Sequence, residues 1–146
     1  MKVTQLRPGT SDVSLVLQPL RVLLRLETRR LPESTESTDS SNSPATTMLS
    51  LVAGDETGTV RVVLWDAAAE TVCPSPTHAL TTLPLVLRRC CTTVVDGCIE
   101  LRLMDGLGTV ALLAAETAAV PAPPVTVNTA VDISATIWEP IDLTFP

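Results

Sequence analysis

Trp65 and Arg61 are the two residues whose types and spacing point most directly to chemistry. They lie four residues apart in the sequence TVRVVLW at 59–65, whose alternation predicts a strand. Val60, Val62 and Leu64 face a core, so Arg61 and Trp65 face outward together. A flat aromatic ring near a guanidinium can stack on a base and contact a phosphate. The alternative is a tryptophan that covers the protein surface beside a loop or a partner.

The remaining reactive residues form no catalytic or metal-binding pattern. The chain has one histidine, His78, and it lacks a serine nucleophile elbow and a phosphate-binding glycine loop. Its cysteines match no zinc spacing, and we expect them to be reduced, half-buried thiols of an intracellular protein. They are Cys73, Cys90, Cys91 and Cys98. We therefore expect a protein that is not an enzyme and has no metal and no cofactor.

The charge is acidic but unevenly distributed. The net charge is −6, from 10 basic and 16 acidic residues, which argues against simple electrostatic capture of nucleic acid. No Lys or Arg follows Met104, whereas five acids do, and three more acids lie at 31–47. Without these eight acids the chain is slightly basic. No apolar window is long enough to span a bilayer, and the start of the chain does not resemble a secretory signal, so we expect no membrane partner.

The first half of the chain alternates as strands do. Residues 13–28 predict one long strand that bends at Pro19, beyond which Leu20, Val22, Leu24 and Leu26 share a face. Residues 31–47 are rich in Ser and Thr and predict a flexible loop. A second strand at 47–54 and a third at 59–65 are joined by a tight turn, in which Gly58 is expected to supply a positive φ. The predicted order is strand, long loop, strand, turn, strand.

The second half of the chain predicts a short helix and the remaining strands of a barrel. Residues 67–72 predict a short helix that prolines end, and 83–91 and 98–104 predict two strands joined at Asp96-Gly97. Residues 109–116 predict a short closing element. Five strands with a helix between the third and fourth are typical of the OB-fold, an all-β Greek-key barrel. We therefore expect an OB-fold domain at 1–116.

The C-terminal residues 117–146 predict a Pro-rich linker and an acidic, disordered tail. Trp138 and Phe145 are isolated large apolar residues in this tail. Either the tail is a disordered remnant, or these two residues form a short docking motif that binds a protein partner or folds back on the barrel.

Three motifs carry a resemblance to a known family. They are LRPG at 6–9, GDETGTV at 54–60 continuing into VLWD at 63–66, and GCIEL at 97–101. Together they resemble the single-OB-fold single-stranded-DNA-binding proteins, which are relatives of replication protein A. This family includes archaeal single-strand binders and the OB subunit of the SOSS DNA-damage complex. The similarity covers about residues 3–116.

The resemblance implies a function and a site. The family binds single-stranded nucleic acid in the barrel groove, and Trp65 falls on its stacking tryptophan. Arg61, Arg88 and Arg102 are then expected to contact the backbone. The resemblance implies a subunit or accessory factor in DNA repair and genome maintenance that has a protein partner. It also implies a nuclear location, with the cytoplasm as the alternative.

Two other functions stay open. Family members usually carry further aromatic residues on the fourth and fifth strands, where this chain has Cys91, Val95 and Arg102. Each stacked base contributes about 1–3 kcal/mol, so their loss favours an OB-fold scaffold subunit with weak or no nucleic-acid affinity. An RNA-binding OB-fold is the other alternative, because stacking does not distinguish the two sugars.

Overall fold

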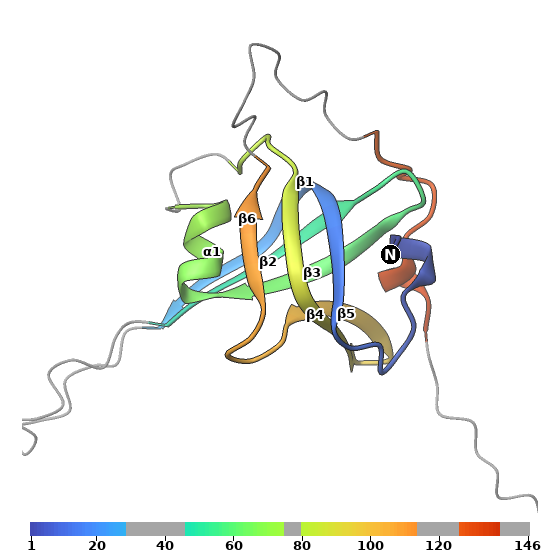
Figure 1. The fold of residues 1–146 in the computed structure, drawn as a ribbon, viewed down its shortest axis with the longest axis horizontal. Coiled ribbons are helices and arrows are strands. Elements are labelled where there is room, and N and C mark those ends of the chain that lie inside the picture. The colour runs from blue at the N-terminus through green and yellow to red at the C-terminus, as the bar shows by residue number, and fades with distance from the viewer. Residues whose placement is uncertain (29–45, 75–79, 114–125, 138–146) are drawn as a thin grey trace, which may run out of the picture.

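The chain folds around a closed β-barrel in a computed structural model that describes residues 1–28, 46–74, 80–113 and 126–137 (Figure 1). The strands are β1 (Val13–Thr28), β2 (Thr46–Gly54), β3 (Thr59–Trp65), β4 (Leu85–Val95), β5 (Cys98–Leu103) and β6 (Thr109–Leu112). Helix α1 (Asp66–Val72) lies between β3 and β4. Two 3-10 turns complete the described elements, η1 (Val3–Gln5) and η2 (Ile133–Ala135).

Strand pairing closes the sheet on itself. The order is β1-β2-β3-β5-β4-β6, and an additional β1–β4 pairing joins the first strand to the fourth. The β3–β5 pair is parallel, whereas the other strand pairs are antiparallel. These pairings confirm the expected all-β barrel with a short helix after its third strand. In the described residues, no helix has the length and apolar character needed to cross a bilayer.

Aliphatic side chains fill the barrel because alternate residues on every strand point inward. Leu17, Leu51, Val62, Leu87 and Leu101 are each at most 1% exposed and come from five different strands. Ala69 and Val72 of α1 join the same cluster. Each large aliphatic side chain contributes about 1.5–3 kcal/mol through burial. With one tryptophan and no other aromatic among the described residues, the core depends on Leu, Val, Ile and Ala.

The long first strand bends twice. One register shift lies between Pro19 and Arg21, as the sequence predicts, and a second lies between Val22 and Leu24. The prediction that Val22, Leu24 and Leu26 share a face is therefore wrong, because the extra residue Leu23 reverses the alternation.

The turn between β2 and β3 uses its glycine differently from the prediction. Gly58 is not among the residues with positive φ. A Cβ at this position would lie 2.9 Å from the carbonyl oxygen of Val131, so glycine is needed for close approach of another segment. Asp96 (φ 52°) and Gly97 (φ 79°) do form the predicted tight turn between β4 and β5.

Residues 126–137 pack on the barrel, so the prediction of a disordered tail is wrong for this segment. Thr59 donates its N–H to the carbonyl of Val131 at 2.8 Å, and Asn128 donates to the carbonyl of Asp55 at 2.9 Å. Ile133 is 8% exposed and belongs to the core cluster. We call residues 126–137 the C-terminal strap. Apolar burial and these backbone bonds offset the entropy of ordering it.

The Asp55–Gly58 turn also holds the N-terminus. The carboxylate of Asp55 accepts hydrogen bonds from the N–H groups of Val3 (3.0 Å) and Thr57 (2.8 Å). The hydroxyl of Thr57 in turn accepts from the N–H of Thr4 at 3.2 Å. The N-terminal turn and the strap therefore lie side by side at one end of the barrel (Figure 1). The GDETG motif at 54–58 therefore stabilises the fold by holding the N-terminal turn.

Candidate functional site

Cross-strand pairing arranges the outward residues of the barrel in rows, because paired residues point to the same side of a sheet. The apolar row consists of Leu26, Met48 and Trp65. The middle row consists of Leu24, Ser50, Val63, Arg102 and Cys91. The charged row consists of Arg21, Val52, Arg61, Glu100 and Thr93. We call the surface that these three rows form the outer face.

Trp65 ends β3 and lies outside the core. It is 45% exposed, and its row neighbour Leu26 is 49% exposed, whereas Met48 between them is half-buried. The adjacent Asp66 is an exposed residue with φ 49°, and its carboxylate accepts the N–H of Thr47 at 3.0 Å. The outward position that the sequence predicts for Trp65 is confirmed, with one carboxylate next to it in the chain.

The centre of the outer face is buried. Val63 is 3% exposed and Ser50 is 7% exposed, although both point away from the core and neither belongs to the core cluster. The indole of Trp65 lies on one side of this buried centre along β3, and the guanidinium of Arg61 lies on the other.

Glu100 joins the two arginines of the outer face. Its Oε1 lies 2.9 Å from Nη2 of Arg61, and its Oε2 lies 2.9 Å from Nη2 and 3.3 Å from Nε of Arg102. The Glu100 side chain is only 9% exposed, whereas those of Arg61 and Arg102 are 31% and 35% exposed. The three groups carry a net charge of +1. Because a guanidinium has five N–H donors, each arginine keeps donors beyond its bonds to Glu100.

The C-terminal strap positions Arg61. Ser134 accepts the backbone N–H of Arg61 at 2.7 Å and donates its hydroxyl to the carbonyl of Ile99 at 2.8 Å. One side chain therefore bridges β3 and β5 where their parallel pairing begins. The sequence prediction missed Ser134. Its signal was the spacing Asp132-x-Ser134, because Asp132 accepts the N–H of Ser134 at 3.0 Å in an Asx turn.

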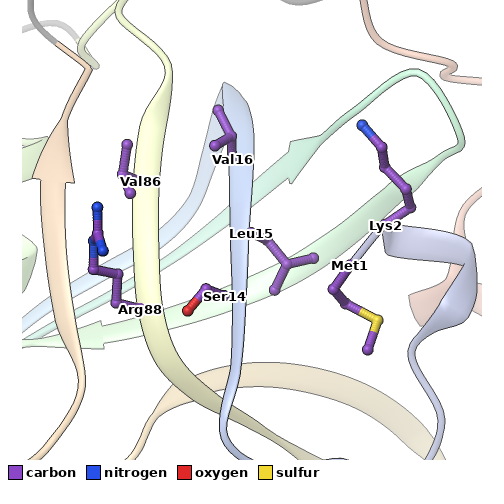
Figure 2. Close-up of a pocket in the computed structure, with 7 residues that line it drawn as sticks. All are labelled: Met1, Lys2, Ser14, Leu15, Val16, Val86 and Arg88. Atoms are coloured by element: carbon purple, nitrogen blue, oxygen red, sulfur yellow. The ribbon is translucent and has the colours of Figure 1, made fainter.

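Arg88 lies apart from the outer face. It sits in the part of β4 that pairs with β1 and β6. Arg102 lies on β5, which pairs with the other part of β4. A surface pocket of about 360 Å³ is lined by Arg88 together with Met1, Lys2, Ser14, Leu15, Val16 and Val86. Figure 2 shows Arg88 beside Val86 on β4, on the side of that strand away from β1. The structure thus brings together Trp65, Arg61 and Arg102 on one face, without Arg88.

Arg21 is a further basic residue of the outer face that the sequence prediction did not select. It is exposed at the end of the charged row, and no ion pair is formed by it among the described residues. Its place on the long first strand could have indicated it. Because the strand bends at Pro19, however, the sequence alternation does not show to which face the Arg21 side chain points.

Several other predicted features lie outside the described residues. These are the 31–47 loop up to residue 45, His78, and the docking residues Trp138 and Phe145. Within the described parts of the chain, no three His, Cys, Asp or Glu residues gather as a metal site would require.

Comparisons with known proteins bear on the fold. No protein-family model matches the chain. No curated protein matches it either. Among solved structures, it resembles the solution structure of a hypothetical protein from Arabidopsis thaliana, with a TM-score of 0.60 and 20% sequence identity. The match covers 99% of this chain and 89% of the plant protein. At this identity the likeness concerns the fold alone.

Proposed function

We propose that the barrel is an OB-fold that binds single-stranded DNA on its outer face. The strand order supports the fold assignment: three antiparallel strands, a parallel β3–β5 contact, and closure through β4 onto β1. The helix between β3 and β4 is in the position expected for this architecture.

The observation that carries the binding proposal is the placement of Trp65 with Arg61 and Arg102. The indole is nearly half exposed, and the two guanidiniums lie on the same face within the next two rows. In the proposed complex a base stacks on Trp65, with Leu26 and Met48 extending the apolar surface under it. The two arginines contact phosphates through their remaining N–H groups. This division into stacking and backbone contacts is typical of sequence-tolerant single-strand binding.

We further propose that the chain is a subunit or accessory factor in DNA repair and genome maintenance, acts in the nucleus and has a protein partner. Three motifs support this role through their resemblance to single-OB-fold single-strand binders: LRPG at 6–9, GDETG at 54–58 with LWD at 64–66, and GCIEL at 97–101.

Tryptophan fluorescence tests the binding proposal. The chain has two tryptophans, so in a Trp138→Phe variant only Trp65 reports. Oligo-dT should quench this fluorescence, and the affinity should fall with salt with a log–log slope of about −1.4 for two phosphate contacts. An absence of quenching at low salt, with oligonucleotide far above micromolar concentration, would contradict it.

A matched pair of variants tests whether DNA binds on the outer face. Arg102→Gln should weaken binding and reduce the salt slope by about 0.7, because one phosphate contact is lost. Arg88→Gln removes the same charge from a different part of the barrel and should leave both quantities unchanged. Equal effects of the two variants would contradict the assignment of the outer face. Parallel titrations with oligo-rU decide between DNA and RNA.

The ion pairing of Glu100 favours a second candidate function. A carboxylate that already binds both arginines lowers their attraction for phosphate, which suits a protein-interaction module with weak nucleic-acid affinity. In that case Trp65 and Leu26 contact a protein partner, because exposed aromatic and aliphatic side chains commonly form the centre of interfaces. Quenching by oligo-dT that weakens with salt decides against this candidate.

A further inference from the structure

In the second half of β1, one edge pairs with none of the described strands. Through residues 18–28 β1 pairs with β2, and on its other edge it pairs with β4 only at residues 13–17. Among the described residues, no strand pairs with that other edge beyond Leu17. Unpaired backbone N–H and C=O groups along an edge are a template for the addition of another strand.

This half of β1 is unusually apolar at its surface. Five of its side chains are between 38% and 49% exposed: Leu20, Val22, Leu23, Leu24 and Leu26. Proteins usually protect such edges with bulges or with outward charges. Register shifts at Leu20 and Leu23 protect the first part, whereas residues 24–28 pair with β2 in continuous register.

The charged residues of this stretch leave its edge unprotected. The guanidinium of Arg25 donates to the carbonyl of Cys73 and pairs with Glu27 at 3.0 Å, so its side chain is only 10% exposed. The Arg25 side chain therefore points toward Cys73 and Glu27 of the same chain. Residues 24–28 are thus a regular edge that exposes two leucines, Leu24 and Leu26.

The same stretch is complementary to itself. If two copies align antiparallel with Leu26 on the two-fold axis, Arg25 of one copy lies opposite Glu27 of the other, so the Arg25–Glu27 pair within each chain exchanges for two such pairs between the chains. Leu26 then contacts Leu26 of the partner subunit. Opposite charges and aliphatic side chains in direct cross-strand pairs each stabilise a sheet. We propose that the protein forms a symmetric dimer through residues 24–28 of β1.

The proposed dimer continues the outer face. The apolar row runs from Trp65 through Met48 to Leu26, which lies at the dimer edge. Across the axis the row continues through the same three residues of the second copy. This arrangement removes Leu24 and Leu26 from water and keeps the strand pairing within the barrel. Because only five residues pair, the interface is small and the affinity is expected to be weak, in the micromolar range.

Sedimentation of the full chain without nucleic acid tests the dimer independently of the binding proposal. The mass should rise from one chain to two as the concentration increases through the micromolar range. Leu26→Lys places like charges on the axis and should weaken association at least about tenfold. A mass of one chain at all concentrations up to the millimolar range would overturn the proposal, and it is also the result expected if another part of the same chain covers this edge.

Cross-linking tests the register. In a background with Cys91→Ser and Cys98→Ser, Leu26→Cys should form an inter-chain disulfide on mild oxidation, since the two positions face each other. Leu24→Cys is the matched control on the same face. In the proposed register its two copies are offset by four residues, about 13 Å along the strands, which is too far for a disulfide. Equal cross-linking of both variants, or of neither, would overturn the register.

Discussion

Arg61 and Glu100 pair side by side across the parallel β3–β5 contact, with Nη2 and Oε1 2.9 Å apart. Because Glu100 also binds Arg102, we expect it to restrain nucleic-acid binding. Glu100→Gln should tighten binding to oligo-dT about three- to tenfold at low salt, and the gain should shrink as salt screens the arginines. Fluorescence titrations at several salt concentrations measure this gain.

The control for Glu100→Gln is Glu56→Gln. Glu56 is an acid that pairs with Lys2 away from the outer face, and the substitution changes the net charge by the same amount. Only Glu100→Gln should raise the affinity. If both variants raise it equally, total charge rather than release of the two arginines governs binding. The stability cost of Glu100→Gln should be about 1–3 kcal/mol, because the buried Glu100 side chain binds both arginines.

Asp55 should make the fold sensitive to acid. Burial raises its pKa, but hydrogen bonds from the hydroxyl and N–H of Thr57 and from the N–H of Val3 outweigh burial and hold the pKa below the usual 3.8. Its contribution is thus complete above pH 3.8 and is lost as the pH falls through the lowered pKa. Asp55→Asn should cost about 1–3 kcal/mol at neutral pH. In denaturant titrations this difference should shrink below pH 3.8; a constant difference would contradict the role of the charge.

Ile133 should contribute to stability although it lies in a segment that its sequence predicts to be disordered. Ile133→Ala should lower the free energy of unfolding by about 2–4 kcal/mol, because it removes a core side chain. Ile137→Ala is the matched control, since Ile137 is 65% exposed in the same segment and should change stability little. Chemical denaturation of both variants compares them. Equal, small effects would show that the strap does not stay docked in solution.

Cys90 should resist alkylation in the folded protein. Burial, with a smaller effect of neighbouring Cys91, raises the pKa of the Cys90 thiol to about 12. Its thiolate is therefore scarce under mildly alkaline conditions, and the side chain is fully covered. Iodoacetamide should modify the half-buried Cys91 and Cys98 first, and Cys90 only after denaturant is added. Tandem mass spectrometry locates the adducts, and early modification of Cys90 would contradict its burial.

Much of the barrel could be predicted because its strands alternate. The third strand, 59–65, has the predicted bounds, and the Asp96-Gly97 turn has the predicted conformation. The fourth strand extends to Val95, beyond the prediction, since its second half pairs with β5. The second shift in β1 could not be predicted, because every residue from Val22 to Leu24 is apolar and the sequence there shows no alternation.

The site could be predicted only in part. The alternation of β3 places Trp65 and Arg61 outward, and that of β5 places Glu100 and Arg102 outward together. No local pattern indicates that Glu100 also binds Arg61, because β3 and β5 are far apart in the sequence. The family resemblance groups Arg88 with these residues, and the predicted strand at 83–91 shows no interruption. In the structure Arg89 has a positive φ of 56°, and the two halves of β4 pair with different strands.

The Ser134 bridge has a consequence for biosynthesis. The hydroxyl that bridges Arg61 and Ile99 belongs to a segment that follows all six strands in the sequence, so this link between β3 and β5 forms only after residue 134 has left the ribosome. Until then Ile133 cannot fill its place in the core. We expect the barrel of the nascent chain to stay incompletely closed until then, and to reach its full stability only once the strap has docked.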